Sequence, residues 1–104
     1  MVDYEVLDRD GDLACLMLRG ELEGDVPSQV LKRELERHYV DDGVRTICVK
    51  LNELDLITLD GVGILLELWE ESRRRGKRFV VQDPQGQVRE KLRITGLLGT
   101  FSEP

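Results

Sequence analysis

Residues 46–75 read TICVKLNELDLITLDGVGILLELWEESRRR, and this stretch decides the predicted fold. Residues 46–51 are β-branched or apolar at almost every position, which is typical of a buried central strand. From Leu59 to Arg75 the apolar residues recur at steps of three and four, so the spacing predicts an amphipathic helix. Gly76 then follows as the glycine that ends it. Residues 52–58 are predicted to be the loop between strand and helix.

The residues before this stretch predict a hairpin and then a loop. Residues 4–7 and 13–18 are short apolar segments, and the turn signal Asp10-Gly11-Asp12 separates them. Such a pattern is typical of two antiparallel strands. Residues 20–25 follow as a polar loop.

A first helix is expected after this loop, because Asp25 is a good capping residue and Pro27 suits the first helical turn. The residues predicted to lie on its apolar side are Val30, Leu31, Leu35 and Tyr39. His38 is predicted to lie on the solvated side. It is the only histidine in the chain, and no cysteine stands at helical spacing from it, so neither a metal site nor histidine-based catalysis is expected.

The C-terminal part predicts a strand at 78–82 and a third helix at 85–95. The residues of this helix expected to point inward are Val88, Leu92 and Ile94. A short last strand is expected near Phe101. Strands that alternate with helices favour a largely parallel sheet. The prediction for residues 1–104 is therefore a single α/β domain with a mixed, largely parallel sheet of four to five strands and three or more helices packed on it.

Charge and composition exclude several classes of function. The net charge is −6, so the average field repels phosphate backbones, and nucleic acid is not an expected partner. The longest apolar run, 13–18, is too short for a membrane span, and the N-terminus lacks the pattern of a signal peptide, so we expect a cytoplasmic protein. Cys15 and Cys48 stand far apart in strand-like segments, which predicts buried free thiols.

No motif for catalysis or for a cofactor is complete. Gly61 and Gly63 open a helix, but Leu66 stands at the third glycine position of a dinucleotide fingerprint, and no P-loop follows. The two glycines are instead expected to let the helix start pack closely against the sheet. We therefore expect neither an enzyme nor a cofactor or metal site, while weak nucleotide binding remains an alternative.

Three segments resemble one protein family. Gly20-Glu21-Leu22-Glu23 is similar to the turn after the second strand of STAS domains, the family of anti-sigma-factor antagonists. Residues 56–65, LITLDGVGIL, resemble the family's loop and helix start, where Asp-Ser-Ser-Gly-Leu-Gly is usual. Residues 88–97, VREKLRITGL, resemble its last helix. The resemblance implies a STAS-like fold that serves bacterial transcription regulation by docking a kinase-like anti-sigma factor.

This sequence differs from the family at the position where members are regulated. Members are controlled by phosphorylation of the first serine in Asp-Ser-Ser-Gly, and here Thr58, Leu59 and Asp60 stand at the aspartate and the two serine positions. The usual phosphoacceptor is absent, so the resemblance supports docking better than switching. Thr58 is the only nearby hydroxyl that could act as a phosphosite, although it is also a good helix cap.

The predicted partner surface combines the loop at 20–25, the loop at 52–58 and the start of the long helix. Apolar residues cover much of this helix, so some are expected to remain exposed as a patch for a partner or for a second copy in a homodimer. The residues predicted to bind the partner are Glu21, Glu23, Asp25, Thr58, Leu59, Asp60 and Val62. The alternative is a non-switching STAS subunit of a larger assembly, such as a stressosome-like scaffold or a lipid-transport complex.

Overall fold

A four-stranded sheet in the order β1-β2-β3-β4 carries the fold. The computed structural model describes residues 2–24 and 28–102. The elements, in chain order, are β1 (Val2–Val6), β2 (Leu13–Leu22), α1 (Ser28–Glu34), α2 (Glu36–Tyr39), β3 (Thr46–Ile57), α3 (Leu59–Arg74), β4 (Arg78–Gln82), α4 (Gly86–Ile94) and α5 (Leu97–Ser102). The predicted α/β class and the mixed, mostly parallel sheet are confirmed.

The predicted hairpin is present as the antiparallel pair β1–β2, whereas β2–β3 and β3–β4 are parallel. At the hairpin turn, Asp10 and Leu13 exchange two backbone hydrogen bonds of 2.9 Å. Gly11 has a φ of +61°, a conformation that glycine adopts without steric cost. The local turn signal was therefore sufficient to position both strands.

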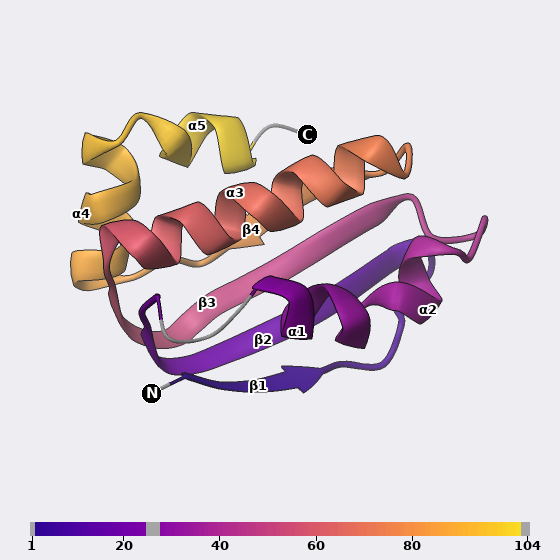
Figure 1. Ribbon diagram of the computed structural model, residues 1–104, viewed down its shortest axis with the longest axis horizontal. Coiled ribbons are helices and arrows are strands. Elements are labelled where there is room, and N and C mark those ends of the chain that lie inside the picture. The colour runs from indigo at the N-terminus through magenta and orange to yellow at the C-terminus, as the bar shows by residue number, and fades with distance from the viewer. Residues whose placement is uncertain (1, 25–27, 103–104) are drawn as a thin grey trace.

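The core lies between one face of the sheet and the helices. In Figure 1, α1 and α3 lie in front of the strands, α4 lies at the end of the sheet where β3 ends, and α5 lies on the far side of α3 from α1. Alternate residues of the central strands point toward these helices, and Leu16 pairs with Val49, which pairs with Val81. These residues join one hydrophobic cluster with Leu65 and Leu68 of α3.

The helix α3 matches its prediction to within one residue at its end. Gly76 has a φ of +75°, and its N–H donates to the carbonyl of Arg73. The N–H of Lys77 donates to the carbonyl of Ser72, at 2.8 Å. This pair of bonds is a Schellman motif, and it explains why the helix ends at a glycine.

The strand β3 is longer than expected. Residues 52–57 were predicted to be part of a loop, but β3 continues to Ile57 because β2 also continues, to Leu22, and pairs with it. The predicted loop at 20–25 is corrected in the same way for residues 20–22. Register shifts between Met17 and Arg19 and between Gly20 and Glu21 keep the two strands paired. The polar residues in this part of β3 are exposed to solvent rather than in a loop.

The first helix is interrupted at Leu35, which separates α1 from α2. Its predicted cap, Asp25 with Pro27, lies outside the described residues. His38 is only 5% exposed, so its predicted place on a solvated face is wrong. The reason is tertiary: the segment after β1 lies against α2, and Arg9 forms an ion pair with Asp41 beside the imidazole.

Two further corrections concern the C-terminal part. Ile94 was expected to point inward, but it is 67% exposed, and only Val88 and Leu92 of α4 are buried. The segment near Phe101 is the helix α5 rather than a strand. Phe101 packs edge-on against Phe79 of β4, with ring centroids 5.6 Å apart. A helix delivers this ring to the core without adding a strand to the sheet.

Candidate site at the start of helix α3

The start of α3 is tied to the end of β2 by hydrogen bonds around Thr58. The Thr58 hydroxyl oxygen accepts from the N–H of Gly61 at 3.1 Å, so the predicted helix cap is present. The backbone N–H of Thr58 donates to the carbonyl oxygen of Leu22 at 3.1 Å, and the hydroxyl lies 3.5 Å from the same oxygen. One carbonyl of β2 therefore orients the first turn of α3.

Two glycines allow this close approach. A Cβ atom on Gly61 would overlap the carbonyl oxygen of Leu22 and lie 2.9 Å from Cγ1 of Ile57. A Cβ atom on Gly24 would lie 2.8 Å from Cβ of Asp60. Gly61 thus has the packing role expected of it. Gly63 does not, because a Cβ atom there would have no neighbour within 4 Å.

The side chain of Gln87, which no sequence pattern marks, holds the end of β3 on the other side of this site. The amide of Gln87, in α4, accepts from the N–H of Ile57 and donates to its carbonyl, both at 3.0 Å. The strand β4 ends at Gln82, which is level with Lys50, so it does not reach Ile57. Gln87 takes the place of a strand partner there. No local pattern marks a glutamine for such a long-range role.

The structure divides the predicted partner-binding residues into exposed and buried ones. Leu59 is 66% exposed, Asp60 is also exposed, and Thr58 is half-buried. Val62 is only 4% exposed and belongs to the core cluster, so its predicted place on the partner surface is corrected. The reason is that Val62 lies on the side of α3 that faces the sheet.

The acidic residues predicted with them lie nearby in sequence on β2. Glu21 is exposed near the end of β2, and Glu23 is half-buried just after it. Asp25 lies outside the described residues.

An open groove runs between the start of α3 and α1. Its lining residues are Gly24, Ser28, Gln29, Leu59, Asp60, Gly63, Ile64 and Glu67. The charged side chains of this lining, Asp60 and Glu67, are both acidic. Leu59 is the large exposed apolar residue of the lining. The groove therefore combines an apolar projection with negative charge.

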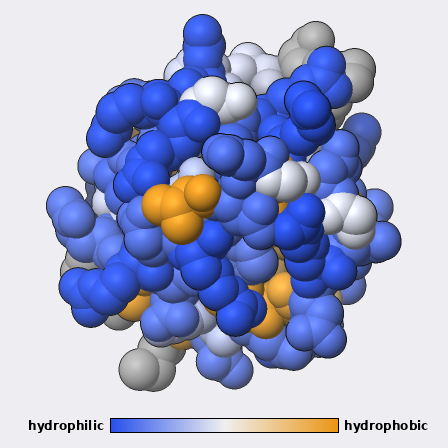
Figure 2. Space-filling model, turned by 90° about the vertical axis from the view of Figure 1, so that its right-hand side faces the viewer, coloured by the Kyte–Doolittle hydropathy of each residue, from blue (hydrophilic) through white to orange (hydrophobic). Residues whose placement is uncertain are grey.

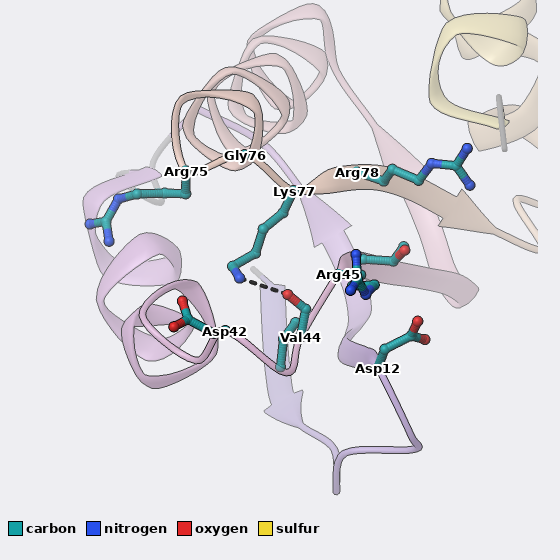
Figure 3. Close-up of a pocket in the computed structure, with 9 residues that line it drawn as sticks. Asp12, Asp42, Val44, Arg45, Arg75, Gly76, Lys77 and Arg78 are labelled. Carbon is teal, nitrogen blue, oxygen red and sulfur yellow. Dashed lines mark hydrogen bonds between the residues drawn. The ribbon is translucent and has the colours of Figure 1, made fainter.

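A second hollow lies at the opposite end of the sheet, beside the end of α3. Figure 3 shows that Lys77 points into it toward Val44, whereas Arg75 and Arg78 point away. The ammonium group of Lys77 donates to the carbonyl oxygens of Val44 at 2.6 Å and Asp41 at 2.9 Å. These bonds join the turn before β4 to the segment before β3, so the lysine has a structural role.

The surface at this end offers little apolar area. Figure 2 looks onto the right-hand side of Figure 1 and shows a mostly hydrophilic surface with small, separate hydrophobic patches. Charged contacts account for part of it, because Arg75 bonds to both Glu36 and Glu71. The end of the molecule that carries Leu59 is the candidate partner surface because it combines an exposed apolar side chain with an open groove.

Burial shifts the pKa values of several titratable groups inside the domain. Burial raises the pKa of the Cys48 thiol, and burial raises the pKa of Tyr39 to about 12. Burial, and then the charge of Arg37, lower the pKa of His38. Within residues 2–24 and 28–102, no three His, Cys, Asp or Glu residues lie close enough together to hold a metal ion. In the same residues, no helix combines the length and the apolar character that a membrane crossing requires.

Comparison with known protein families matches residues 4–103 to the STAS domain. The chain belongs to the STAS domain family. This match spans most of the β1–β2 hairpin and the whole described part of the candidate site.

Solved structures agree with this assignment. The anti-sigma factor antagonist SpoIIAA in its unphosphorylated form superposes with a TM-score of 0.75 at 20% identity, covering 96% of this chain and 85% of SpoIIAA. An anti-sigma factor antagonist from Mycobacterium paratuberculosis gives 0.70 at 22% identity, covering 97% and 83%. The murine anion transporter Slc26a9 gives 0.68 at 12% identity, covering 84% of this chain and 14% of the transporter. At these identities the likeness concerns the fold. No curated protein sequence matches the chain.

Proposed function

We propose that this STAS domain is a cytoplasmic regulatory binding module of the anti-sigma-factor-antagonist type, which docks a kinase-like anti-sigma factor. The observation that carries the proposal is the exposure of Leu59, at 66%, on the first turn of α3 beside an open groove. Large apolar side chains that stand out from a surface are typical anchors of protein interfaces. The fold shared with anti-sigma factor antagonists supports the same kind of partner.

The proposal includes constitutive binding. Leu59 stands where the family places its phosphoacceptor serine, and a leucine side chain accepts no phosphate. The neighbouring hydroxyl of Thr58 is engaged as the helix cap, and it lies against the carbonyl oxygen of Leu22. A phosphate on Thr58 would have to break these contacts and would lie beside the carboxylate of Asp60. Thr58, one residue before the family's usual acceptor position, is therefore the nearby hydroxyl to test for phosphorylation.

The absent hydroxyl also favours a second candidate function. A STAS domain without a switch suits a permanent subunit of a larger assembly, such as a stressosome-like scaffold or a lipid-transport complex. The two candidates predict different partners in a pull-down from the native lysate. A kinase-like anti-sigma factor supports the first candidate, and scaffold or transporter subunits support the second.

The site itself is tested by replacing its exposed apolar residue. Leu59→Asp should weaken binding of the captured partner by about tenfold or more, because an interface anchor contributes about 1–2 kcal/mol or more. Val40→Asp is the matched control, since Val40 is 64% exposed in the segment after α2. Isothermal titration calorimetry measures both variants. Equal affinity for Leu59→Asp and the unmodified protein would remove the start of α3 from the interface.

Constitutive binding is tested with the partner kinase and ATP. Mass spectrometry should find no phosphate on the unmodified protein, whereas Leu59→Ser should gain one. A stoichiometric phosphothreonine at Thr58 that releases the partner would contradict constitutive binding. It would show instead that phosphorylation at Thr58 controls binding.

A further inference from the structure

The sheet brings the two cysteines of the chain together. Cys15 on β2 and Cys48 on β3 are direct partners in the parallel register, although they are distant in sequence. Both are free thiols. Side chains of directly paired residues in a sheet point to the same face, so the two sulfur atoms share one face of the sheet.

This face is the one opposite the helices. Ala14 and Leu16, on either side of Cys15, belong to the core cluster, and so do Ile47 and Val49 around Cys48. Side chains alternate along a strand, so both cysteines point away from that cluster. Neither cysteine belongs to the hydrophobic core cluster that the described residues form.

The spacing suits a disulfide. Neighbouring strands lie about 4.8 Å apart. Disulfides form between residues whose Cα atoms are about 4.4–6.8 Å apart. A pair of cysteines that face each other in register therefore meets the requirement on the Cα–Cα distance. The two thiols also influence each other electrostatically. Burial is the main cause of the raised pKa of Cys48, and Cys15 is the next cause.

The two thiols are covered by neighbouring side chains of the sheet. Cys15 is 5% exposed and Cys48 is 0% exposed, but the residues on the same face around them are only half-buried, among them Met17, Lys50 and Val80. Side chains of the sheet itself therefore shield the thiols, rather than a packed helix. Side chains at the surface of a sheet change rotamer without unfolding of the domain, and this motion would give a small reagent access to the sulfur atoms.

We propose that Cys15 and Cys48 are a reversible disulfide-forming pair, oxidised by a small hydroperoxide. The Cys15 sulfur, the less deeply buried one, attacks the peroxide, whose O–O bond breaks to give a sulfenic acid and an alcohol or water. The Cys48 sulfur then attacks the sulfenic sulfur, the S–O bond breaks, and water leaves with the oxygen. Two thiols thus lose two electrons and two protons in total, and one peroxide is reduced. A dithiol reductant reverses the change.

The disulfide would fasten β2 to β3 in the register that they already have. It links strands across the whole segment that contains α1 and α2, and a cross-link that closes a long loop limits the unfolded chain. The oxidised domain should therefore unfold at a higher temperature than the reduced one. The candidate partner surface lies at the other end of these strands, so partner affinity should stay unchanged.

The test uses the folded protein and hydrogen peroxide as the probe. After treatment, the chain is unfolded, free thiols are alkylated, and the intact mass is measured. The expected product is a monomer that has lost the mass of two hydrogen atoms and takes up no alkyl group, and dithiothreitol restores both thiols. Cys15→Ser and Cys48→Ser are the matched controls, and neither should lose two hydrogen atoms.

Two results would overturn the proposal. One is a folded protein that still takes up two alkyl groups after a peroxide treatment that oxidises the urea-unfolded chain. The other is a disulfide between two chains in place of the one within the chain. A peptide map that joins β2 to β3 and a raised unfolding temperature would support it.

Discussion

Replacing Gly61 by alanine tests the contact that positions the candidate site. The added methyl group would overlap the carbonyl oxygen of Leu22 and lie 2.9 Å from Cγ1 of Ile57. Leu22 and Ile57 are paired partners on adjacent strands, so neither backbone can move alone. The start of α3 must therefore move away from the sheet. Overpacking of this kind costs about 1–3 kcal/mol.

Gly63→Ala is the matched control, since it lies in the same helix and its Cβ atom would meet nothing within 4 Å. Alanine in place of glycine stabilises a helix by about 1 kcal/mol, and both variants receive that gain. The difference in unfolding free energy between them therefore isolates the steric cost. We expect Gly63→Ala to be more stable than the unmodified protein and Gly61→Ala to be less stable than Gly63→Ala by about 1–3 kcal/mol.

Urea unfolding followed by circular dichroism measures this difference. For a domain of this size, about 1 kcal/mol corresponds to a shift of roughly 4–8 °C in the melting temperature, so thermal unfolding provides a second measurement. If Gly61→Ala proved as stable as Gly63→Ala, the close approach of α3 to Leu22 would not be a constraint of the fold. The position of the first turn of α3 would then not depend on a glycine at position 61.

Three further predictions concern other parts of the molecule. Thr58→Ala should lower the unfolding free energy by about 1 kcal/mol, whereas Thr58→Ser keeps the capping oxygen and should lose little; urea unfolding that finds the two variants equal would contradict the cap. Burial and Arg37 lower the pKa of His38 in the folded state below its ordinary value of 6.5, so the unfolded chain binds the proton more readily. The stability that the neutral imidazole contributes is present above pH 6.5 and is lost as the pH falls. His38→Gln should therefore flatten the dependence of unfolding free energy on pH between about 7.5 and 5.5. An unchanged slope would exclude His38 as its source. Replacing Cys15 and Cys48 together by alanine should lower the unfolding free energy by at most a few kcal/mol. Calorimetry on the reduced protein should find the partner affinity intact. A folded double variant that no longer bound the partner would show that a thiol takes part in binding.

Local signals in the sequence were sufficient for several elements. The turn at Asp10-Gly11-Asp12, the helical spacing after Leu59 and the glycine at position 76 each involve residues within a few positions of one another. The cap formed by Thr58 belongs to the same group, since it follows from where the helix begins. In each case the physical cause is a backbone preference or a short-range hydrogen bond, which neighbouring residues alone can express.

The features that the sequence did not reveal all depend on which segments meet in space. The strand β3 extends to Ile57 because β2 continues beside it, and no pattern within 52–57 marks that pairing. His38 is buried because the segment after β1 lies against α2. Gln87 was overlooked for the same reason, since its partner is a backbone thirty residues away.

The two glycines and the two cysteines make the division clearest. By sequence alone Gly61 and Gly63 were equivalent, but the tertiary structure places only Gly61 against the carbonyl oxygen of Leu22. Cys15 and Cys48 were each correctly predicted to be buried thiols, because apolar neighbours mark a strand. That they face each other was decided by the register of β2 on β3. Register is a long-range property of strand pairing, set by the packing of the whole sheet, so no local stretch of sequence contains it.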